Sequence, residues 1–164
     1  MYQYYLRPPP SWAASLRRPY ATFDQGHWPN PLHASSPLTD RKSTFLAYAS
    51  VLTDPATFPE FLANLRALPG TNIKRATHCM YAFRAAGVAH QSDGGEGGSG
   101  DRLARLLQLS GSEDVVVVVW RWYGGVKLGS DRWKCISKVA MEALDKGGFR
   151  HGPEEQEQRK KKKR

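Results

Sequence analysis

The chain has 164 residues, 40% of them hydrophobic, and a formal net charge of +9 at pH 7. This length fits one domain with tails, and the lack of a long apolar run excludes a membrane-spanning helix, so we expect a soluble protein with no membrane partner. The two cysteines, Cys79 and Cys135, form neither a CxxC pair nor a disulfide framework, which excludes a cysteine-stapled secreted domain and predicts two reduced thiols.

Residues 1–39 are rich in proline, serine, arginine and aromatic residues, and they show neither helical nor strand periodicity. The proline content predicts an extended, disordered segment. An organelle transit peptide is the alternative, because the segment is rich in arginine and its first acidic residue is Asp24. The consecutive prolines Pro8–Pro10 disfavour the amphipathic helix that such a peptide needs.

Ordered patterning follows this segment and first predicts a strand, a helix and a second strand. In residues 43–51 the apolar side chains alternate with the period of a strand. Residues 58–68 place large apolar side chains on one helical stripe, with Pro59 in the first turn and a proline–glycine pair after the end. Residues 76–84 alternate again and predict the second strand.

The second half of the domain repeats the succession of strand and helix. A glycine-rich loop, residues 92–100, leads into a short helix at 101–109. Residues 114–123 are β-branched and apolar on both faces, which predicts a central strand covered on both sides. The clearest helix runs from 130 to 147, with a serine as its cap. Strands alternating with helices over residues 40–150 predict a two-layer α/β domain.

The turn between the central strand and the last helix, RWYGGVKLGSDR at 121–132, combines glycines, aromatics and charges. Glycines allow a sharp turn, and the free backbone N–H groups of such a turn attract anions. In this interpretation Arg121 donates hydrogen bonds to an anion, and Trp122 and Tyr123 offer flat surfaces for stacking. The alternative is a tight turn whose aromatics pack in the core. The candidate anion-binding residues are Gly124, Gly125 and Gly129.

The loop SDGGEGGSGDR holds Asp93 and Glu96, which lie close enough in sequence to share a hard cation. The pair has too few ligands, the loop lacks the Lys-Ser/Thr of a P-loop, and no HxxxH or CxxC spacing occurs, so we predict no metal and no cofactor. His78 is a candidate general base if one of these carboxylates comes near, and a structural histidine otherwise. A solvent-exposed mobile loop is the alternative to any binding role.

The C-terminal residues 151–164 contain no large apolar side chain, which predicts a solvated, disordered, basic tail. The run Lys160–Arg164 is typical of a nuclear import signal, of a nucleic-acid contact or of a solubilising charge cluster. We expect a cytoplasmic protein. The two ends of the chain leave a nuclear location and an organellar location as alternatives.

Four stretches in a fixed order carry a resemblance to a known family. They are DRKSTFLAYASV at 40–51, ATHCMYAFR at 76–84, DGGEGGSG at 93–100 and RWYGGVKLGSDR at 121–132. Together they resemble the IMPACT family, specifically the eukaryotic branch of its Impact N-terminal domain, and the similarity covers residues 40–150. The resemblance implies a fold like the second domain of ribosomal protein S5, with helices on one face of a mixed sheet.

The resemblance also implies a function. Eukaryotic members of the family are translational regulators in the stress response to amino-acid starvation. They restrain the starvation kinase of translation initiation factor 2 alpha by competing for its ribosome-associated activator, and they also associate with actin. The implied role is therefore that of a non-enzymatic binding module. The chain departs from the family pattern at Gly94, where the usual Asp-Asp-Gly-Glu loop has its second aspartate, and in its first 39 residues, which are too few to hold the regulators' N-terminal RWD domain.

We predict a partner-binding surface in which arginines pair with acidic groups and aromatic side chains anchor the partner. Its residues are Asp93, Glu96, Arg121, Trp122, Tyr123, Asp131 and Arg132. Two alternatives come from other functional classes. The basic surplus and the lysine tail favour direct binding to RNA or to the ribosome, and His78 as a base would suit an enzyme acting on a phosphorylated substrate, such as a hydrolase.

Overall fold

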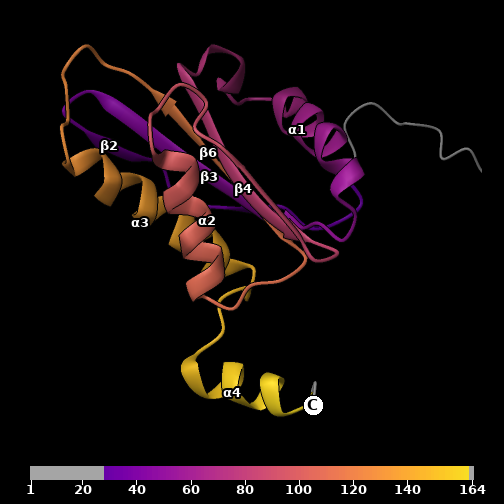
Figure 1. The fold of residues 1–164 in the computed structure, drawn as a ribbon. Coiled ribbons are helices and arrows are strands. Elements are labelled where there is room, and N and C mark those ends of the chain that lie inside the picture. Colours follow the sequence, from indigo (N-terminus) through magenta and orange to yellow (C-terminus); the bar gives the residue numbers. More distant parts are fainter. Residues whose placement is uncertain (1–27, 163–164) are drawn as a thin grey trace, which may run out of the picture.

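The fold is a six-stranded sheet with helices on both faces, followed by a separate C-terminal helix (Figure 1). The computed structural model describes residues 28–162. The strands are β1 (His33–Ala34), β2 (Leu38–Asp40), β3 (Ser43–Val51), β4 (His78–Ala85), β5 (Val88–Ser92) and β6 (Val115–Trp122). The helices are α1 (Phe58–Ala67), α2 (Ser99–Leu109), α3 (Asp131–Lys146) and α4 (Pro153–Lys162), with short 3₁₀ turns η2 (Pro55–Thr57) and η3 (Ile73–Arg75) around α1.

Every strand pairing within the described residues is antiparallel, in the order β1-β3-β6-β4-β5 with β2 also on β3. The predicted α+β class is confirmed, and the expected mixed sheet is corrected to an antiparallel one. The reason is that two crossover connections interleave. β3 and β4 point the same way and are joined through α1, but β6 lies between them. β5 and β6 likewise point the same way and are joined through α2, with β4 between them.

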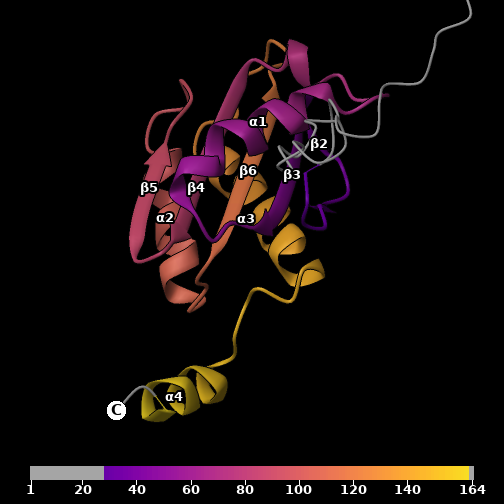
Figure 2. The same ribbon diagram turned by 90° about the vertical axis from the view of Figure 1, so that its right-hand side faces the viewer.

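The two faces of the sheet bury separate apolar clusters (Figures 1 and 2). α2 and α3 cover one face, where they enclose residues such as Phe45 and Met80. α1 covers the other face through Phe61 and Leu65, which are fully buried. The expectation of helices on one face is therefore corrected. Because β6 is apolar on both sides, as predicted, burying it requires a helix layer on each face.

Residues 28–39 belong to the folded domain, which corrects the expected domain boundary. β1 and β2 pair with β3, and Trp28 is buried against Phe61 with ring centroids 5.0 Å apart. The indole N–H of Trp28 donates to Ser50 Oγ over 2.8 Å. Burial of single residues and short strand pairings hold this proline-rich stretch in place. Neither produces a repeating pattern of apolar residues, so the sequence shows no periodicity here. The rest of the N-terminal segment, with its transit-peptide alternative, lies outside the described residues.

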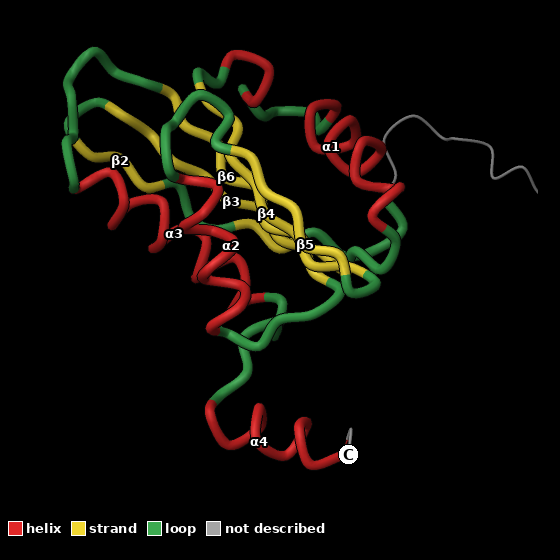
Figure 3. The backbone as a smooth tube through the Cα atoms, in the orientation of Figure 1, coloured by secondary structure: helices red, strands yellow, loops and turns green. Residues whose placement is uncertain are grey.

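The C-terminal segment was expected to be disordered, yet it contains α4, which lies apart from the sheet (Figure 3). Lys161 Nζ lies 3.1 Å from Glu157 Oε1 at i,i+4 spacing, an arrangement that supports an exposed helix. Gln156 Nε2 donates to Leu109 O over 3.1 Å and ties α4 to the end of α2. Within residues 28–162, no helix combines the length and apolar character that a membrane span requires.

The β4–β5 hairpin turns through Ala86 and Gly87, whose φ angles of 49° and 77° are both positive, as in a type I′ turn. An alanine in the left-handed region is strained, and asparagine is preferred there. We expect Ala86→Asn to raise the free energy of unfolding by about 0.5–1 kcal/mol, measured by urea titration. Gly87→Ala is the opposing control and should lower it. Equal stabilities of the two variants would contradict the turn geometry.

Candidate functional site

A buried carboxylate, Glu96, lies at the centre of the charged residues that follow the glycine bends. Its side chain is 2% exposed, and its two oxygens accept hydrogen bonds from different arginines. Arg121 Nη1 donates to Oε2 over 2.6 Å, and Arg132 Nη1 donates to Oε1 over 3.0 Å. His78 Nε2 lies 3.5 Å from Oε2. The fold thus brings four of the predicted site residues into direct contact.

The topology of the sheet explains why these residues meet. Glu96 lies in the loop after β5, Arg121 near the end of β6, and Arg132 in the first turn of α3. Because β5 and β6 point the same way, the segments that follow them leave the same end of the sheet. His78, the first residue of β4, is opposite Arg121 in the strand register and so reaches the same place.

Arg121 is almost fully enclosed, with 4% of its surface exposed. Its guanidinium carbon lies 5.3 Å from the ring centres of both Phe45 and Tyr123, and Nη2 donates to Ser43 Oγ over 3.3 Å. Burying a charge is costly unless the charge is paired and hydrogen-bonded, which Glu96 provides here. Arg121 therefore acts first as half of an internal ion pair, and it presents little surface to a partner.

A pocket of about 620 Å³ lies beside this ion pair, and we call it the basic pocket. Besides Glu96 and Arg121, its walls include His78, Tyr123, Lys127, Arg132 and Trp133. Three cationic side chains and one carboxylate line it, so the pocket carries an excess of positive charge. Tyr123 is 42% exposed, and the Arg132 guanidinium lies 4.3 Å from a Trp133 ring centre. The pocket therefore combines cations with accessible aromatic surface.

Two members of the basic pocket, Lys127 and Trp133, were not among the predicted site residues. Lys127 lies in the glycine-rich turn between Gly125 and Gly129, and this position could have identified it as a site residue from the sequence. Trp133 falls on the apolar stripe of the last helix, a position for which the periodicity predicts burial. It is half-buried, and the guanidinium groups of Arg102 and Arg132 lie 5.2 and 4.3 Å from its rings. Helical periodicity cannot distinguish a core tryptophan from one stacked under arginines at the surface.

The Asp93 side chain binds the backbone at the start of α2. Its carboxylate accepts from the backbone N–H groups of Gly98 over 3.0 Å and Gly100 over 2.7 Å, and these bonds lower the pKa of Asp93. Glu96 is bound by arginines, so the two candidate cation ligands have separate partners. Within residues 28–162, no group of three or more His, Cys, Asp or Glu side chains is placed to hold a metal ion.

Trp122 and Asp131 also lie outside the basic pocket. Trp122 points to the α1 face of the sheet, opposite to its neighbours in the strand, and donates its indole N–H to Asn72 O over 3.0 Å. Asp131 accepts from Arg41 over 2.6 Å and from Lys134 over 3.1 Å, and these cations lower the pKa of Asp131. Any partner contact by these two residues would lie beyond the pocket.

The glycines of the turn have structural explanations. A Cβ at Gly124 would lie 1.8 Å from Lys42 O, so only glycine allows this approach, and the Gly124 N–H points to Ser43 Oγ. Gly125 and Gly129 have φ angles of 89° and 56°, which other residues rarely adopt. Anion binding by the turn itself stays a prediction.

Gly94, which stands where the resembling family usually has an aspartate, is fitted closely against β4. Its φ is 54°, and a Cβ at this position would lie 1.9 Å from Cys79 O. The loop in this conformation cannot hold an aspartate there. At this departure from the family pattern the backbone of the loop therefore lies directly against β4.

His78 directs both ring nitrogens at oxygen atoms of the protein. Nε2 faces Glu96 Oε2 at 3.5 Å, and Nδ1 faces Gly94 O at 3.2 Å. A general base needs an unprotonated nitrogen that faces the substrate. The imidazole lines the pocket and is 22% exposed, so it is not sealed in the core. Its orientation nevertheless favours a positioning role beside Glu96.

The chain is similar to a described protein family and to several curated proteins. A family model described as Impact N-terminal domain matches residues 41–144. Protein IMPACT of Bos taurus is 38% identical over 131 residues, which cover 76% of this chain and 41% of that protein. The chain thus spans about two fifths of the length of the curated relatives it matches.

Two solved structures are also similar. The crystal structure of a hypothetical protein superposes with a TM-score of 0.58 at 21% identity, covering 74% of this chain and 62% of that chain, and it shares the fold alone. The structure of the two-domain translational regulator Yih1 is 34% identical with a TM-score of 0.46, covering 70% of this chain and 46% of that chain.

Proposed function

The chain belongs to the family of the Impact N-terminal domain, and on this premise we propose that it is a non-enzymatic binding module that regulates translation. The family match spans residues 41–144 and so includes every residue of the basic pocket. The role implied by the family resemblance is restraint of the amino-acid-starvation kinase of translation initiation factor 2 alpha. We propose that the chain acts in the cytoplasm, through the ribosome-associated activator of that kinase.

The observation that carries this proposal is the charge balance of the basic pocket. Glu96 is already shared by Arg121 and Arg132, so the pocket keeps a net positive charge around exposed aromatic surface. Such a surface attracts an acidic segment of a protein and anchors it through Tyr123 and Trp133. Lys127 is exposed and is the cation best placed to meet the partner.

The chemistry of the pocket supports binding over catalysis. His78 has no nitrogen directed at the open space, and Arg121 and Arg132 are held by the buried carboxylate. These charges are fixed in place by one another, which suits recognition of a preformed acidic group. An enzyme on phosphorylated substrates, the alternative from the sequence, would use His78 as its base, whose two ring nitrogens face protein oxygen atoms here.

The test uses the exposed residues and leaves the buried ion pair intact. Immobilised chain is expected to retain the kinase activator from extracts of starved cells, detected by mass spectrometry. The double variant Tyr123→Ala, Lys127→Glu should reduce retention by about tenfold or more, because it removes an aromatic anchor and reverses a charge. Lys162→Glu makes the same charge change on α4, away from the pocket, and is the matched control (Figure 1).

Three outcomes would count against the proposal: no retention by the wild-type chain, equal retention by the double variant, or an equal loss in Lys162→Glu. The last outcome points to the RNA or ribosome alternative, since the basic tail would then drive binding. In that case affinity for RNA should fall steeply with salt concentration. Actin, the second partner implied by the resemblance, is assayed with the same variants by co-sedimentation.

A further inference from the structure

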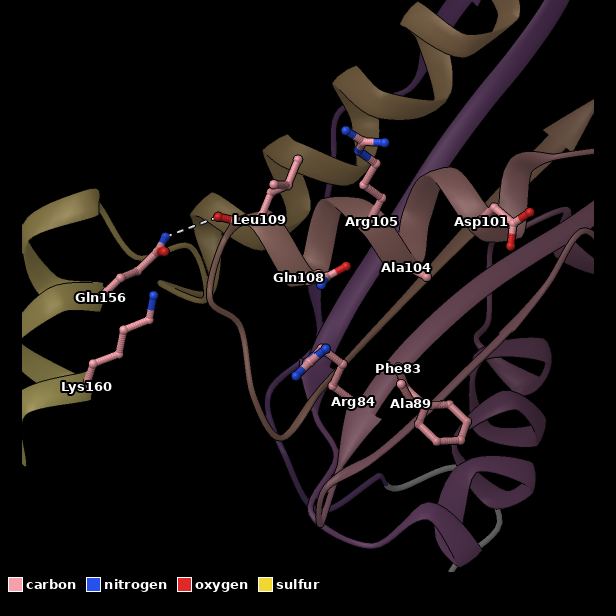
Figure 4. Close-up of a pocket in the computed structure, with 10 residues that line it drawn as sticks. All are labelled: Phe83, Arg84, Ala89, Asp101, Ala104, Arg105, Gln108, Leu109, Gln156 and Lys160. Carbon is pink, nitrogen blue, oxygen red and sulfur yellow. Dashed lines mark hydrogen bonds between the residues drawn. The ribbon is translucent and has the colours of Figure 1, made fainter. Parts of the chain in front are cut away.

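The exposed edge of the sheet at β5 forms a second binding surface, separate from the basic pocket. We propose that an extended, acidic segment of a partner protein adds to the sheet along β5 and places acidic side chains in the groove between β5, α2 and α4. The groove has a volume of about 720 Å³ (Figure 4). It lies at the Ala85 end of β4, whereas the basic pocket lies at the His78 end.

Backbone geometry shows which groups of β5 are available. Ala85 and Val88 flank the two-residue turn, so they form a hydrogen-bonded pair. Along the hairpin, hydrogen-bonded pairs then alternate with pairs that are not hydrogen-bonded to each other. The N–H and C=O groups of the intervening residues, Ala89 and Gln91, therefore point away from β4. No other strand among residues 28–162 pairs with β5 on that side. Two donors and two acceptors are thus presented to an incoming strand.

The edge carries few of the features that normally prevent strand addition. Natural edge strands are protected by charged side chains, prolines or bulges. β5 reads VAHQS, with no lysine, acidic residue or proline, and it pairs with β4 without a bulge. Most of it is exposed, including Val88 at 50%. The strand can therefore template an extended segment, as in other cases of β-augmentation.

The walls of the groove favour acidic side chains on the incoming segment. Arg105 from α2 and Lys160 from α4 are among the residues that line the groove, and Figure 4 shows the Arg105 guanidinium on the side of α2 away from β5. Arg84 pairs with Glu113, whereas Asp101 accepts from the neutral amide of Gln91, a bond that does not neutralise its charge. Arg105 and Lys160 form no salt bridge with any side chain that the structure describes. Three cationic side chains and one carboxylate line the groove beside a neutral strand edge, and this excess of positive charge favours an acidic partner.

A second copy of this chain fits the groove less well. Edge-to-edge pairing of two β5 strands would bring the Arg105 and Lys160 side chains of both copies together, and like charges placed close together disfavour association. The exposed Leu109, at 66%, lies at the end of α2 beside these cations. It offers an apolar contact to a partner side chain that follows the paired residues.

The probe is the acetylated, amidated peptide Glu-Val-Glu-Val-Glu, which alternates acidic and β-branched side chains. In NMR titrations of the full chain it should bind with amide shifts centred on Ala89 and Gln91. The lysine counterpart Lys-Val-Lys-Val-Lys should bind at least about tenfold more weakly. Arg105→Glu should weaken binding of the acidic peptide to a similar extent, and Ala89→Pro should do so because proline removes the outward N–H without affecting the β4 pairing.

Shifts elsewhere than β5, equal binding of the two peptides, or no binding at millimolar peptide would overturn the proposal. If Ala89→Pro fails to fold, the exposed Arg105→Glu and an acidic peptide N-methylated at its central glutamate still test the proposal. A dimer that is lost in Ala89→Pro would assign the edge to self-pairing instead. Lys127→Glu should leave peptide binding unchanged, and Arg105→Glu should leave retention of the kinase activator unchanged, so either proposal can fail alone.

Discussion

Replacing Glu96 with alanine is expected to lower the free energy of unfolding by about 3–5 kcal/mol, measured by urea titration followed by circular dichroism. The carboxylate is 2% exposed and accepts charged hydrogen bonds from Arg121 and Arg132 at 2.6 and 3.0 Å. Without it, Arg121 stays buried with an uncompensated charge, and this desolvation is the main cost. Arg132 is about one-third exposed and can turn to water, so it contributes less.

A double-mutant cycle separates the buried pair from packing. Arg121→Met keeps an apolar chain between Phe45 and Tyr123, so the variant with both Glu96→Ala and Arg121→Met should be more stable than Glu96→Ala alone. Glu113→Ala is the matched control. It breaks the exposed pair with Arg84, which should cost less than about 1 kcal/mol. Similar losses in Glu96→Ala and Glu113→Ala would show that the Glu96 ion pair is not effectively buried.

The same pair links stability to the proposed function. Glu96 fixes the positions of two arginines that line the basic pocket, so its loss should alter the pocket before the domain unfolds. Among the described residues, the hydrogen bonds and salt bridges of the Glu96 carboxylate involve neither Tyr123 nor Lys127, so replacing these two residues is the cleaner probe of binding. Loss of binding in Glu96→Ala alone would not show whether Glu96 contacts the partner or only holds the two arginines in position.

Trp28→Ala is the second large effect that we expect, with a loss of about 3–5 kcal/mol in the free energy of unfolding. Trp28 is 7% exposed, packs edge-on against Phe61 and donates its indole N–H to Ser50 Oγ. Its removal would leave a cavity on the α1 face and take away the donor to Ser50 Oγ, which would keep only its own bond to Pro31 O. Thermal unfolding followed by the fluorescence of the remaining tryptophans measures the change.

Two comparisons separate the contributions to this effect. Ser50→Ala keeps the ring and removes its acceptor, so it should cost about 1–3 kcal/mol. Relative to a chain that starts at residue 28, one that starts at residue 41 should lose at least as much stability as Trp28→Ala does. If the two truncations were equally stable, residues 28–40 would not belong to the folded domain.

The hairpin shows how a local signal was missed. Asn-Gly would have predicted the turn between β4 and β5, but the chain has Ala86 and Gly87, which form the same turn with some strain. β5 itself is short and mostly polar, so alternation gave no strand signal. β5 is a strand because it forms hydrogen bonds with β4, and this pairing is visible only in the three-dimensional structure.

By itself, the sequence determined the elements whose apolar side chains repeat along the chain. β3, β6, α1 and α3 lie within about two residues of the predicted ranges, because periodic burial is a local property. It also indicated the charged and glycine-rich stretches that follow β5 and β6. Their resemblance to the Impact N-terminal domain is a property of the same residues.

Only the tertiary structure decided what those charges do. Glu96 and Arg121 are buried together because the segments after β5 and β6 leave the same end of the sheet. Trp28 joins the core because β1 and β2 pair with β3. Asp93 and Asp131 are less buried than Glu96, and they accept from backbone N–H groups and from surface cations instead. Such contacts join residues distant in the chain, and no local pattern encodes the burial that turns a surface carboxylate into an internal ion pair.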